Sequence, residues 1–193
     1  MVSHCKRFVI TFNGEIYNHL NLRTLLEKDI SHIPWRGRSD TETLLTAWQI
    51  WGLKKTLNII NGMFAFAIWD RKTKSLVLAR DRIGEKPLYY GWIKNSITFS
   101  SEIRAFKECP NFNCDIDRRA ISLQMRHSYI PAPYSIYKNI NKLLPGSYII
   151  IKRTNNYLLK SRPKIYWSVN KVFKSGKRNQ FLGGSEQAVE HLD

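Results

Sequence analysis

The stretch Phe12-Asn13-Gly14-Glu15-Ile16-Tyr17-Asn18 decides how the rest of the chain is interpreted. The apolar run Phe8-Val9-Ile10 precedes it, and leucines with helical spacing follow it. This pattern predicts a strand over residues 6–12 and a helix over residues 18–28. Asn13-Gly14 is the expected turn between them, because both residue types tolerate positive φ. An Asn amide beside a Gly N–H can also form a pair of donors for an anion.

Five further short motifs follow in order: Ser39-Asp40-Thr41-Glu42, Gly62-Met63-Phe64-Ala65-Phe66-Ala67, Arg80-Asp81-Arg82-Ile83-Gly84-Glu85-Lys86-Pro87-Leu88-Tyr89-Tyr90, Phe99-Ser100-Ser101-Glu102-Ile103 and Pro145-Gly146. Together with the first stretch, they resemble the class II glutamine amidotransferase domain of glutamine-hydrolysing asparagine synthetases. The resemblance covers residues 8–167, which is most of the chain.

The spacing of apolar residues predicts two β-hairpins, over residues 63–80 and residues 89–100. Strands of the first hairpin are almost continuously apolar, which is typical of strands covered on both faces. The resemblance implies an α+β fold of the N-terminal nucleophile hydrolase type. That fold is a four-layer sandwich with two antiparallel sheets between helical layers, and we expect an incomplete version of it here.

Helix boundaries are indicated by capping residues. Ser39 and Glu42 have the spacing of a capping box, so a helix is expected to begin there, and Gly52 is expected to end it. Asp117 is expected to cap a helix over residues 118–126. A final strand is expected over residues 157–167.

The resemblance also implies roles for four residues. Asn13 and Gly14 match the oxyanion-hole positions of the family, and Glu15 matches a carboxylate that lines the pocket for L-glutamine. Asp40 matches the residue that holds the ammonium group of the substrate. On local sequence alone, the favoured explanation of Asp40 is its place in the first turn of a helix, where a carboxylate complements the helix dipole.

The resemblance does not extend to a nucleophile. In the family, an N-terminal cysteine attacks glutamine, but residue 2 here is Val2. Cys5 lies eight residues before Asn13 and has no α-amino group of its own to act as base, so we assign it no catalytic role. The carboxylate-binding arginine of the family, which precedes the Asn-Gly-Glu motif, also has no counterpart.

We expect residues 1–167 to form a partial amidotransferase domain. Residues 168–193 are expected to form a linker and the start of a synthetase domain that is missing, so that the chain is truncated at both ends. ATP and Mg²⁺ would act in that second domain, and no cofactor or metal is expected on this chain. Regions 80–90 and 99–103 are candidates for the interface with it, although hairpin packing explains them equally well.

The net charge of +16 favours acidic partners. Basic residues are densest over residues 160–178, with Tyr166, Trp167 and Phe173 among them, but no nucleic-acid motif accompanies them. We therefore expect a solvated surface or a face that docks onto a protein, without nucleic-acid binding. No apolar run is long enough to cross a membrane and no signal peptide opens the chain, so a cytoplasmic location is expected.

Three functional hypotheses remain open. The first is a truncated glutaminase domain of a glutamine-dependent asparagine synthetase, inactive alone. In the full-length family, ATP, aspartate and glutamine give asparagine, glutamate, AMP and pyrophosphate. The second is a non-catalytic module that binds glutamine or docks onto another chain. An amidotransferase domain for another acceptor is a third reading, because nothing in the sequence identifies the acceptor.

Overall fold

The computed structural model describes residues 1–153, 158–160 and 162–190. Its larger sheet is antiparallel and contains β1 (Phe8–Ile16), β2 (Gly62–Asp70), β3 (Ser75–Arg80), β7 (Ser147–Arg153), β8 (Leu158–Lys160) and β9 (Lys164–Ile165). The strand order is β1-β2-β3-β7-β8, and β9 also pairs with β7. The smaller antiparallel sheet has the order β5-β4-β6, with bounds Ser96–Ser100, Tyr89–Ile93 and Ile140–Lys142. The two sheets confirm the predicted antiparallel arrangement.

Both predicted hairpins are present. β2 and β3 pair in a register that sets Phe66 opposite Ala79, and β4 and β5 pair so that Tyr90 lies opposite Phe99. The prediction that β2 and β3 are covered on both faces is confirmed, because most of their side chains are buried. Because successive side chains of a strand point to opposite faces, β2 and β3 contribute to two separate cores, one on each side of the larger sheet.

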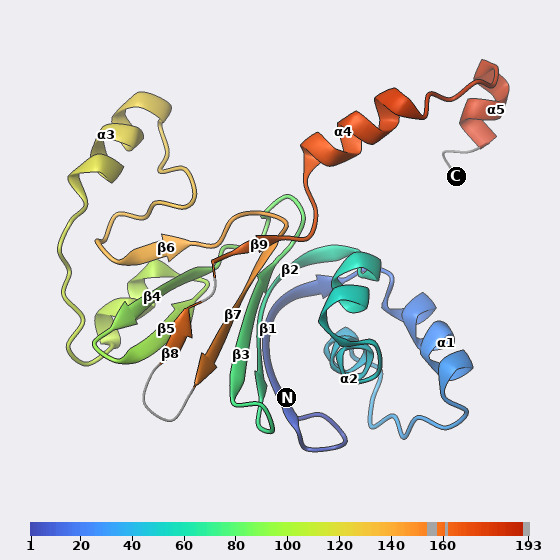
Figure 1. Ribbon diagram of the computed structural model, residues 1–193, viewed down its shortest axis with the longest axis horizontal. Coiled ribbons are helices and arrows are strands. Elements are labelled where there is room, and N and C mark those ends of the chain that lie inside the picture. Colours follow the sequence, from blue (N-terminus) through green and yellow to red (C-terminus); the bar gives the residue numbers. More distant parts are fainter. Residues whose placement is uncertain (154–157, 161, 191–193) are drawn as a thin grey trace.

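The first core lies between the larger sheet and the helices α1 (His19–Asp29) and α2 (Asp40–Ile59), which cover one face of it (Figure 1). Phe64 and Phe66 of β2 stack at 5.4 Å, and Trp48 of α2 meets the Phe66 ring edge-on at 5.9 Å. Burial of each such aromatic side chain stabilises the fold by roughly 1.5–3 kcal/mol. The helical layer thus packs against the sheet near the centre of β2.

The second core lies between the two sheets. Ala65 and Ala67 of β2 face Leu88, Tyr90 and Phe99 of the smaller sheet and its approach. Beyond the smaller sheet, the short 3₁₀ helix η1 (Ile103–Glu108) buries one phenylalanine in a third cluster. The order of layers is helices, sheet, sheet and a thin outer layer, while α3 (Arg118–His127) lies to the side (Figure 1).

The prediction that Asn13-Gly14 is a turn is wrong. β1 continues through both residues to Ile16, and Gly14 lies opposite Phe64 of β2. Gly14 has φ of 153°, and a Cβ atom there would overlap the carbonyl oxygen of Met63. The glycine is therefore required by the close approach of two strands, and the chain turns only at Tyr17 and Asn18.

Gly52 does not end α2 as predicted. It interrupts the helix with φ of 72° and ψ of −179°, and a second helical segment then continues to Ile59. The second segment persists because Thr56 and Leu57 are fully buried against the sheet. Glycine supplies the left-handed backbone that lets the two segments meet at a kink. The predicted start of the helix is confirmed, since Ser39 Oγ accepts a hydrogen bond from Glu42 N at 3.2 Å.

The region predicted as a linker contains a helix, α4 (Val169–Arg178), which begins at the N-cap Ser168. α5 (Ser185–Glu190) follows, and both helices extend away from the sheets (Figure 1). The expected final strand is instead two short strands, β8 and β9. Tyr157 and Ser161 of that prediction lie outside the described residues. None of the helices described here is both long and apolar enough to cross a membrane.

Candidate functional site

β1 is the edge strand of the larger sheet, and its edge away from β2 is paired over only part of its length. Met1 and Ile10 exchange backbone hydrogen bonds, with the Met1 ammonium 2.7 Å from Ile10 O, so the N-terminal residues pair with the first part of the strand. In a β-strand, the backbone N–H and C=O groups of every second residue point to the same edge. The N–H groups of Phe12 and Gly14 therefore point to the same side as that of Ile10. Among the described residues, no strand pairs with Phe12 or Gly14 on this side.

Asp40 closes the far end of this edge. It is the first residue of α2, and its Oδ2 atom accepts a hydrogen bond from Ile16 N at 2.9 Å. Its Oδ1 atom accepts from the backbone N–H of Thr41 at 2.6 Å. A carboxylate offers about four lone-pair directions, so both oxygens can accept further donors. Asp40 therefore contacts β1 at Ile16, two residues along the strand from Gly14, and presents a negative charge on the same edge.

Asn13 lies beside Gly14 but projects toward the smaller sheet. Its Nδ2 atom donates to Ser101 Oγ at 2.9 Å, which joins β1 to the end of β5. Both residues line a groove of about 330 Å³ between the two sheets, together with Thr11, Leu88 and Phe99. Since one amide hydrogen of Asn13 is used by Ser101, the other can pair with a ligand.

Glu15 is exposed and follows Asn13 on the same face of β1, because side chains alternate along a strand. The structure thus brings all four predicted site residues to one stretch of β1 and the start of α2. Ser101 was not among the predicted site residues. Its only signal was its position in the Phe99–Ile103 motif, and pairing between β5 and Asn13 could not be seen without the fold.

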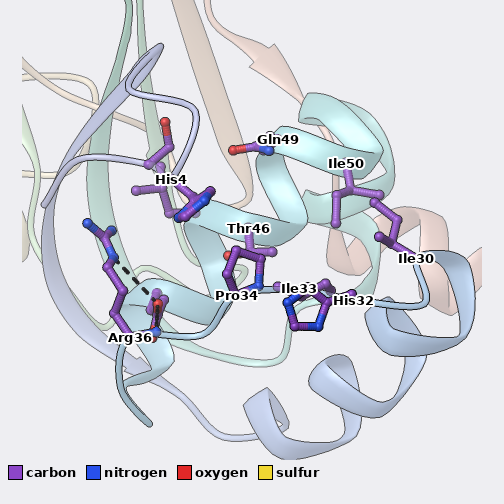
Figure 2. Close-up of a pocket in the computed structure, with 12 residues that line it drawn as sticks. His4, Ile30, His32, Ile33, Pro34, Arg36, Thr46, Gln49 and Ile50 are labelled. Atoms are coloured by element: carbon purple, nitrogen blue, oxygen red, sulfur yellow. Dashed lines mark hydrogen bonds and ion pairs between the residues drawn. The ribbon is translucent and has the colours of Figure 1, made fainter.

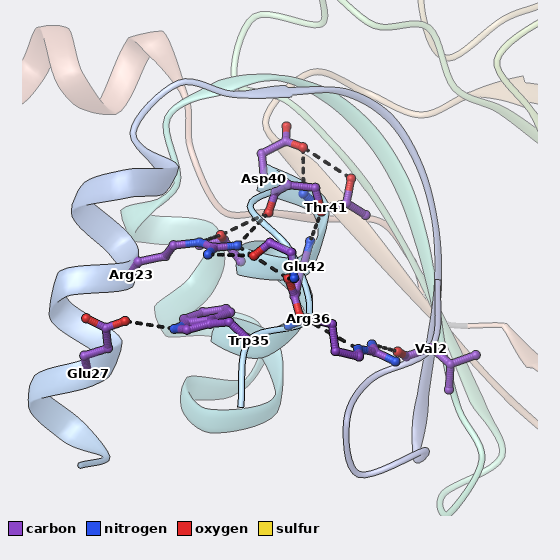
Figure 3. Close-up of polar contacts among 11 residues, drawn as sticks. Val2, Arg23, Glu27, Trp35, Arg36, Asp40, Thr41 and Glu42 are labelled. Carbon is purple, nitrogen blue, oxygen red and sulfur yellow. Dashed lines mark hydrogen bonds and ion pairs between the residues drawn. The ribbon is translucent and has the colours of Figure 1, made fainter. Parts of the chain in front are cut away.

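The loop that leads to Asp40 is fixed by a buried carboxylate. Glu42 accepts hydrogen bonds from the backbone N–H groups of Arg36 at 2.8 Å and Gly37 at 2.9 Å (Figure 3). Arg23 of α1 completes the arrangement, donating to Thr43 Oγ1 at 2.8 Å and to Gly37 O at 2.9 Å. The capping box predicted only the start of the helix. The Glu42 side chain in fact holds the preceding loop, and so positions Asp40.

The loop after β3 is arranged around Asp81, which is fully buried. Its carboxylate accepts hydrogen bonds from the backbone N–H groups of Gly84, Glu85, Lys86 and, at 3.3 Å, Phe64. Arg80 donates to three carbonyl oxygens of Gly84, Lys86 and Leu143 at 2.6–2.8 Å, and burial lowers the pKa of its guanidinium. The polar atoms of Arg80 and Asp81 are therefore engaged in hydrogen bonds within the protein, and these two side chains stabilise the loop.

The three cysteines lie away from Gly14 and Asp40. Cys5 is in the turn before β1, with its Sγ 3.3 Å from Ser3 Oγ. At about 3.3 Å per strand residue, Gly14 is roughly 20 Å along β1 from Phe8, the end nearest that turn. Cys109 Sγ lies 3.7 Å from Ala105 O beside η1, and Cys114 is exposed before α3. No cysteine is among the residues that line the groove beside Asn13.

Comparison with solved structures defines the class of fold. The chain superposes on glutamine phosphoribosylpyrophosphate amidotransferase of B. subtilis with a TM-score of 0.56 and 20% sequence identity. The match covers 84% of this chain and 30% of that one. Two antiparallel sheets with a helical layer, in this arrangement, confirm the predicted α+β fold of the N-terminal nucleophile hydrolase type.

The sequence comparisons define the family. Residues 1–167 match the family described as glutamine amidotransferase domain, and the chain belongs to this family. "Asparagine synthetase [glutamine-hydrolyzing] 1" of Bacillus subtilis is 34% identical over 152 residues, which is 79% of this chain and 23% of that protein. "Asparagine synthetase [glutamine-hydrolyzing] 3" of Arabidopsis thaliana is 40% identical over 111 residues, covering 56% of this chain and 18% of the relative. The chain thus spans about a quarter or less of the length of these relatives.

Proposed function

We propose that this chain is the glutaminase part of a glutamine-dependent asparagine synthetase and binds L-glutamine along the uncovered part of the β1 edge. The observation that carries the proposal is the position of Gly14 N–H and the Asp40 carboxylate on one edge, with the Asn13 amide beside them. In this proposal, ATP, Mg²⁺ and aspartate are handled by a synthetase domain outside this chain. The protein is taken to be cytoplasmic.

Each group has a role that fits its chemistry. Asp40 pairs with the α-ammonium group of glutamine, because a carboxylate with spare lone pairs can accept charged donors. Asn13 Nδ2 and Gly14 N–H donate to the side-chain carbonyl oxygen, where negative charge would develop during acyl transfer. Glu15 lines the pocket. Ser101 orients the Asn13 amide through the hydrogen bond at 2.9 Å.

We further propose that this chain binds glutamine without hydrolysing it. Acyl transfer requires a nucleophile within reach of the carbonyl carbon, with a base beside it. Cys5 is at the opposite end of β1, and the groove beside Asn13 is lined by no thiol. A glutamine-binding module is therefore the better description of the isolated chain.

Calorimetric titration with L-glutamine tests the binding site. Asp40→Asn retains an oxygen that can accept from Ile16 N–H but removes the charge, so we expect affinity to fall roughly tenfold or more. Glu108→Gln removes an exposed carboxylate at the end of η1 and serves as the matched control, with unchanged affinity. Absence of binding by the unmodified chain, or equal affinity in Asp40→Asn, would contradict the proposed site.

Glutamate release from glutamine tests the second claim. We expect no release by the unmodified chain or by Cys5→Ser. Release that disappears in Cys5→Ser would show that this thiol reaches the substrate, and the non-catalytic reading would then be wrong. Size-exclusion chromatography distinguishes a folded module, which elutes as a defined species, from a fragment that aggregates.

A further inference from the structure

A separate cavity lies on the helical side of the larger sheet. It encloses about 150 Å³ between the N-terminal turn, the loop that follows α1, and the first half of α2 (Figure 2). None of Asn13, Gly14 and Asp40 lines it. The side chains that matter most for its chemistry are His4, His32, Ile33, Leu45, Gln49 and Ile50.

The walls of this cavity are held in place by contacts already formed. Glu42 fixes the loop through the backbone N–H groups of Arg36 and Gly37, at 2.8 and 2.9 Å. Arg36 in turn donates to Val2 O at 2.6 Å, which ties the loop to the N-terminal turn. A ligand would therefore enter a site that is largely preformed, and little of its binding energy would be spent on ordering the chain.

One side of the cavity is aliphatic. Leu45 is 2% exposed, and Ile33 and Ile50 are half-buried next to it. Apolar cavities of this size hold a molecule about as large as benzene. The aliphatic side thus suits a ligand body of a few carbon atoms, such as a branched chain.

The cavity lining also contains polar side chains that offer hydrogen-bond donors. His4 and His32 approach from different segments, and Figure 2 shows both imidazoles among the lining side chains. The negative charge of Glu42 is compensated by Arg23 at 3.5 Å and Arg36 at 3.8 Å, and its oxygens already accept backbone hydrogen bonds. Because this carboxylate is engaged and the cationic Arg36 also lines the cavity, an anionic group can be accommodated there.

We propose that this cavity binds a small branched aliphatic carboxylate. Its methyl groups would pack against Leu45, Ile33 and Ile50, and its carboxylate would face His4 and His32. The inference does not depend on glutamine binding, because none of the residues proposed to contact glutamine lines this cavity. It assigns the chain a second ligand site on the opposite side of the sheet from the groove beside Asn13.

The probes are isovalerate and its neutral counterpart isovaleramide, each titrated into the full chain with amide chemical shifts or heat as the readout. We expect isovalerate to bind with a dissociation constant on the order of 1 mM, as suits so small a ligand. Isovaleramide should bind roughly tenfold more weakly, because it lacks the charge. Absence of isovalerate binding at tens of millimolar, or equal binding of the two probes, would overturn the proposal.

Two variants locate the site. His32→Ala removes one donor and should weaken isovalerate binding roughly tenfold, whereas His127→Ala on the exposed surface of α3 should leave it unchanged. Thr46→Phe should fill the cavity and abolish binding. Both cavity variants should keep the far-UV circular dichroism spectrum and the cooperative thermal unfolding of the unmodified chain, which shows that they fold. Equal isovalerate affinity in His32→Ala and His127→Ala would contradict the assignment.

Discussion

Two loops of this protein use carboxylates in opposite ways. Asp81 is fully buried and accepts four backbone hydrogen bonds from its own surroundings. Asp40 is only half-buried, and it accepts the Ile16 and Thr41 N–H groups two residues along β1 from the Gly14 N–H, with which no described strand pairs on that side. Both residues belong to the motifs on which the predicted resemblance to the amidotransferase family was based. A buried motif carboxylate thus stabilises the fold, whereas the half-buried Asp40 keeps lone pairs that the proposed glutamine site would use.

The largest expected effect comes from Asp81→Ala. Four backbone N–H groups would lose their acceptor inside the protein, and the loop after β3 would no longer be held. We expect the free energy of unfolding to fall by about 3–5 kcal/mol, measured by denaturant titration. Asp115→Asn, on an exposed loop, is the control and should change stability little. A small loss in Asp81→Ala would remove the contrast with Asp40.

Gly14→Ala should be the next most damaging change. The added Cβ would overlap Met63 O, and φ of 153° is unfavourable for alanine, so β1 and β2 would have to separate. We expect a loss of about 2–4 kcal/mol. Gly176→Ala in α4 meets no atom within 4 Å and should slightly stabilise the helix. Equal thermal stability of these two variants would show that Gly14 is not needed for strand packing.

A third carboxylate, Asp70, extends the comparison to the pH dependence of stability. Arg7 donates to both oxygens of Asp70, at 2.8 and 2.6 Å, and holds the pKa of that carboxyl well below its usual range. A lowered pKa in the folded state contributes stability above about pH 4, and this contribution is lost as the pH falls further. We expect Asp70→Asn to lower Tm by a few degrees at pH 7 and progressively less below pH 4. A difference that stayed constant with pH would contradict this role for the ion pair.

The smallest effect on stability is expected at Asn13. Its side chain is exposed and makes one hydrogen bond, to Ser101, so Asn13→Ala should change the free energy of unfolding by about 0.5 kcal/mol or less. The same variant should nevertheless weaken glutamine binding. Ser101→Ala tests whether the hydrogen bond orients the amide, and should weaken binding less than Asn13→Ala. Loss of stability without loss of affinity would place Asn13 with the structural residues.

Local patterns were sufficient to predict the hairpins and the caps. The ends of β3 and β5 were predicted to the residue, because turn residues and apolar runs mark them in sequence. Ser39 and Asp117 cap their helices as predicted, with side-chain oxygens that accept Glu42 N and Arg119 N. These features depend on neighbours within a few positions, so the sequence alone contains the necessary information.

The predictions that were wrong depended on partners distant in sequence. Asn13-Gly14 has the composition of a turn, but pairing with β2 extends the strand through it. Gly52 has the composition of a helix end, but burial of Leu57 against the sheet continues the helix beyond it. α4 was missed because basic residues and Gly176 obscured the helical spacing of Val169, Val172 and Phe173. The central place of Asp81 and the contact between Asn13 and Ser101 could not be predicted, since both require the finished fold.

The half-covered edge of β1 also bears on how the protein behaves in concentrated solution. Each molecule presents a short run of backbone groups that an identical molecule could match edge to edge. At low ionic strength, the charge of +16 keeps such molecules apart. Added salt shortens the range of this repulsion to about 10 Å at 0.1 M and leaves the edges free to meet. The solubility of this protein is therefore expected to decrease with salt, so dilute buffers should keep it dispersed.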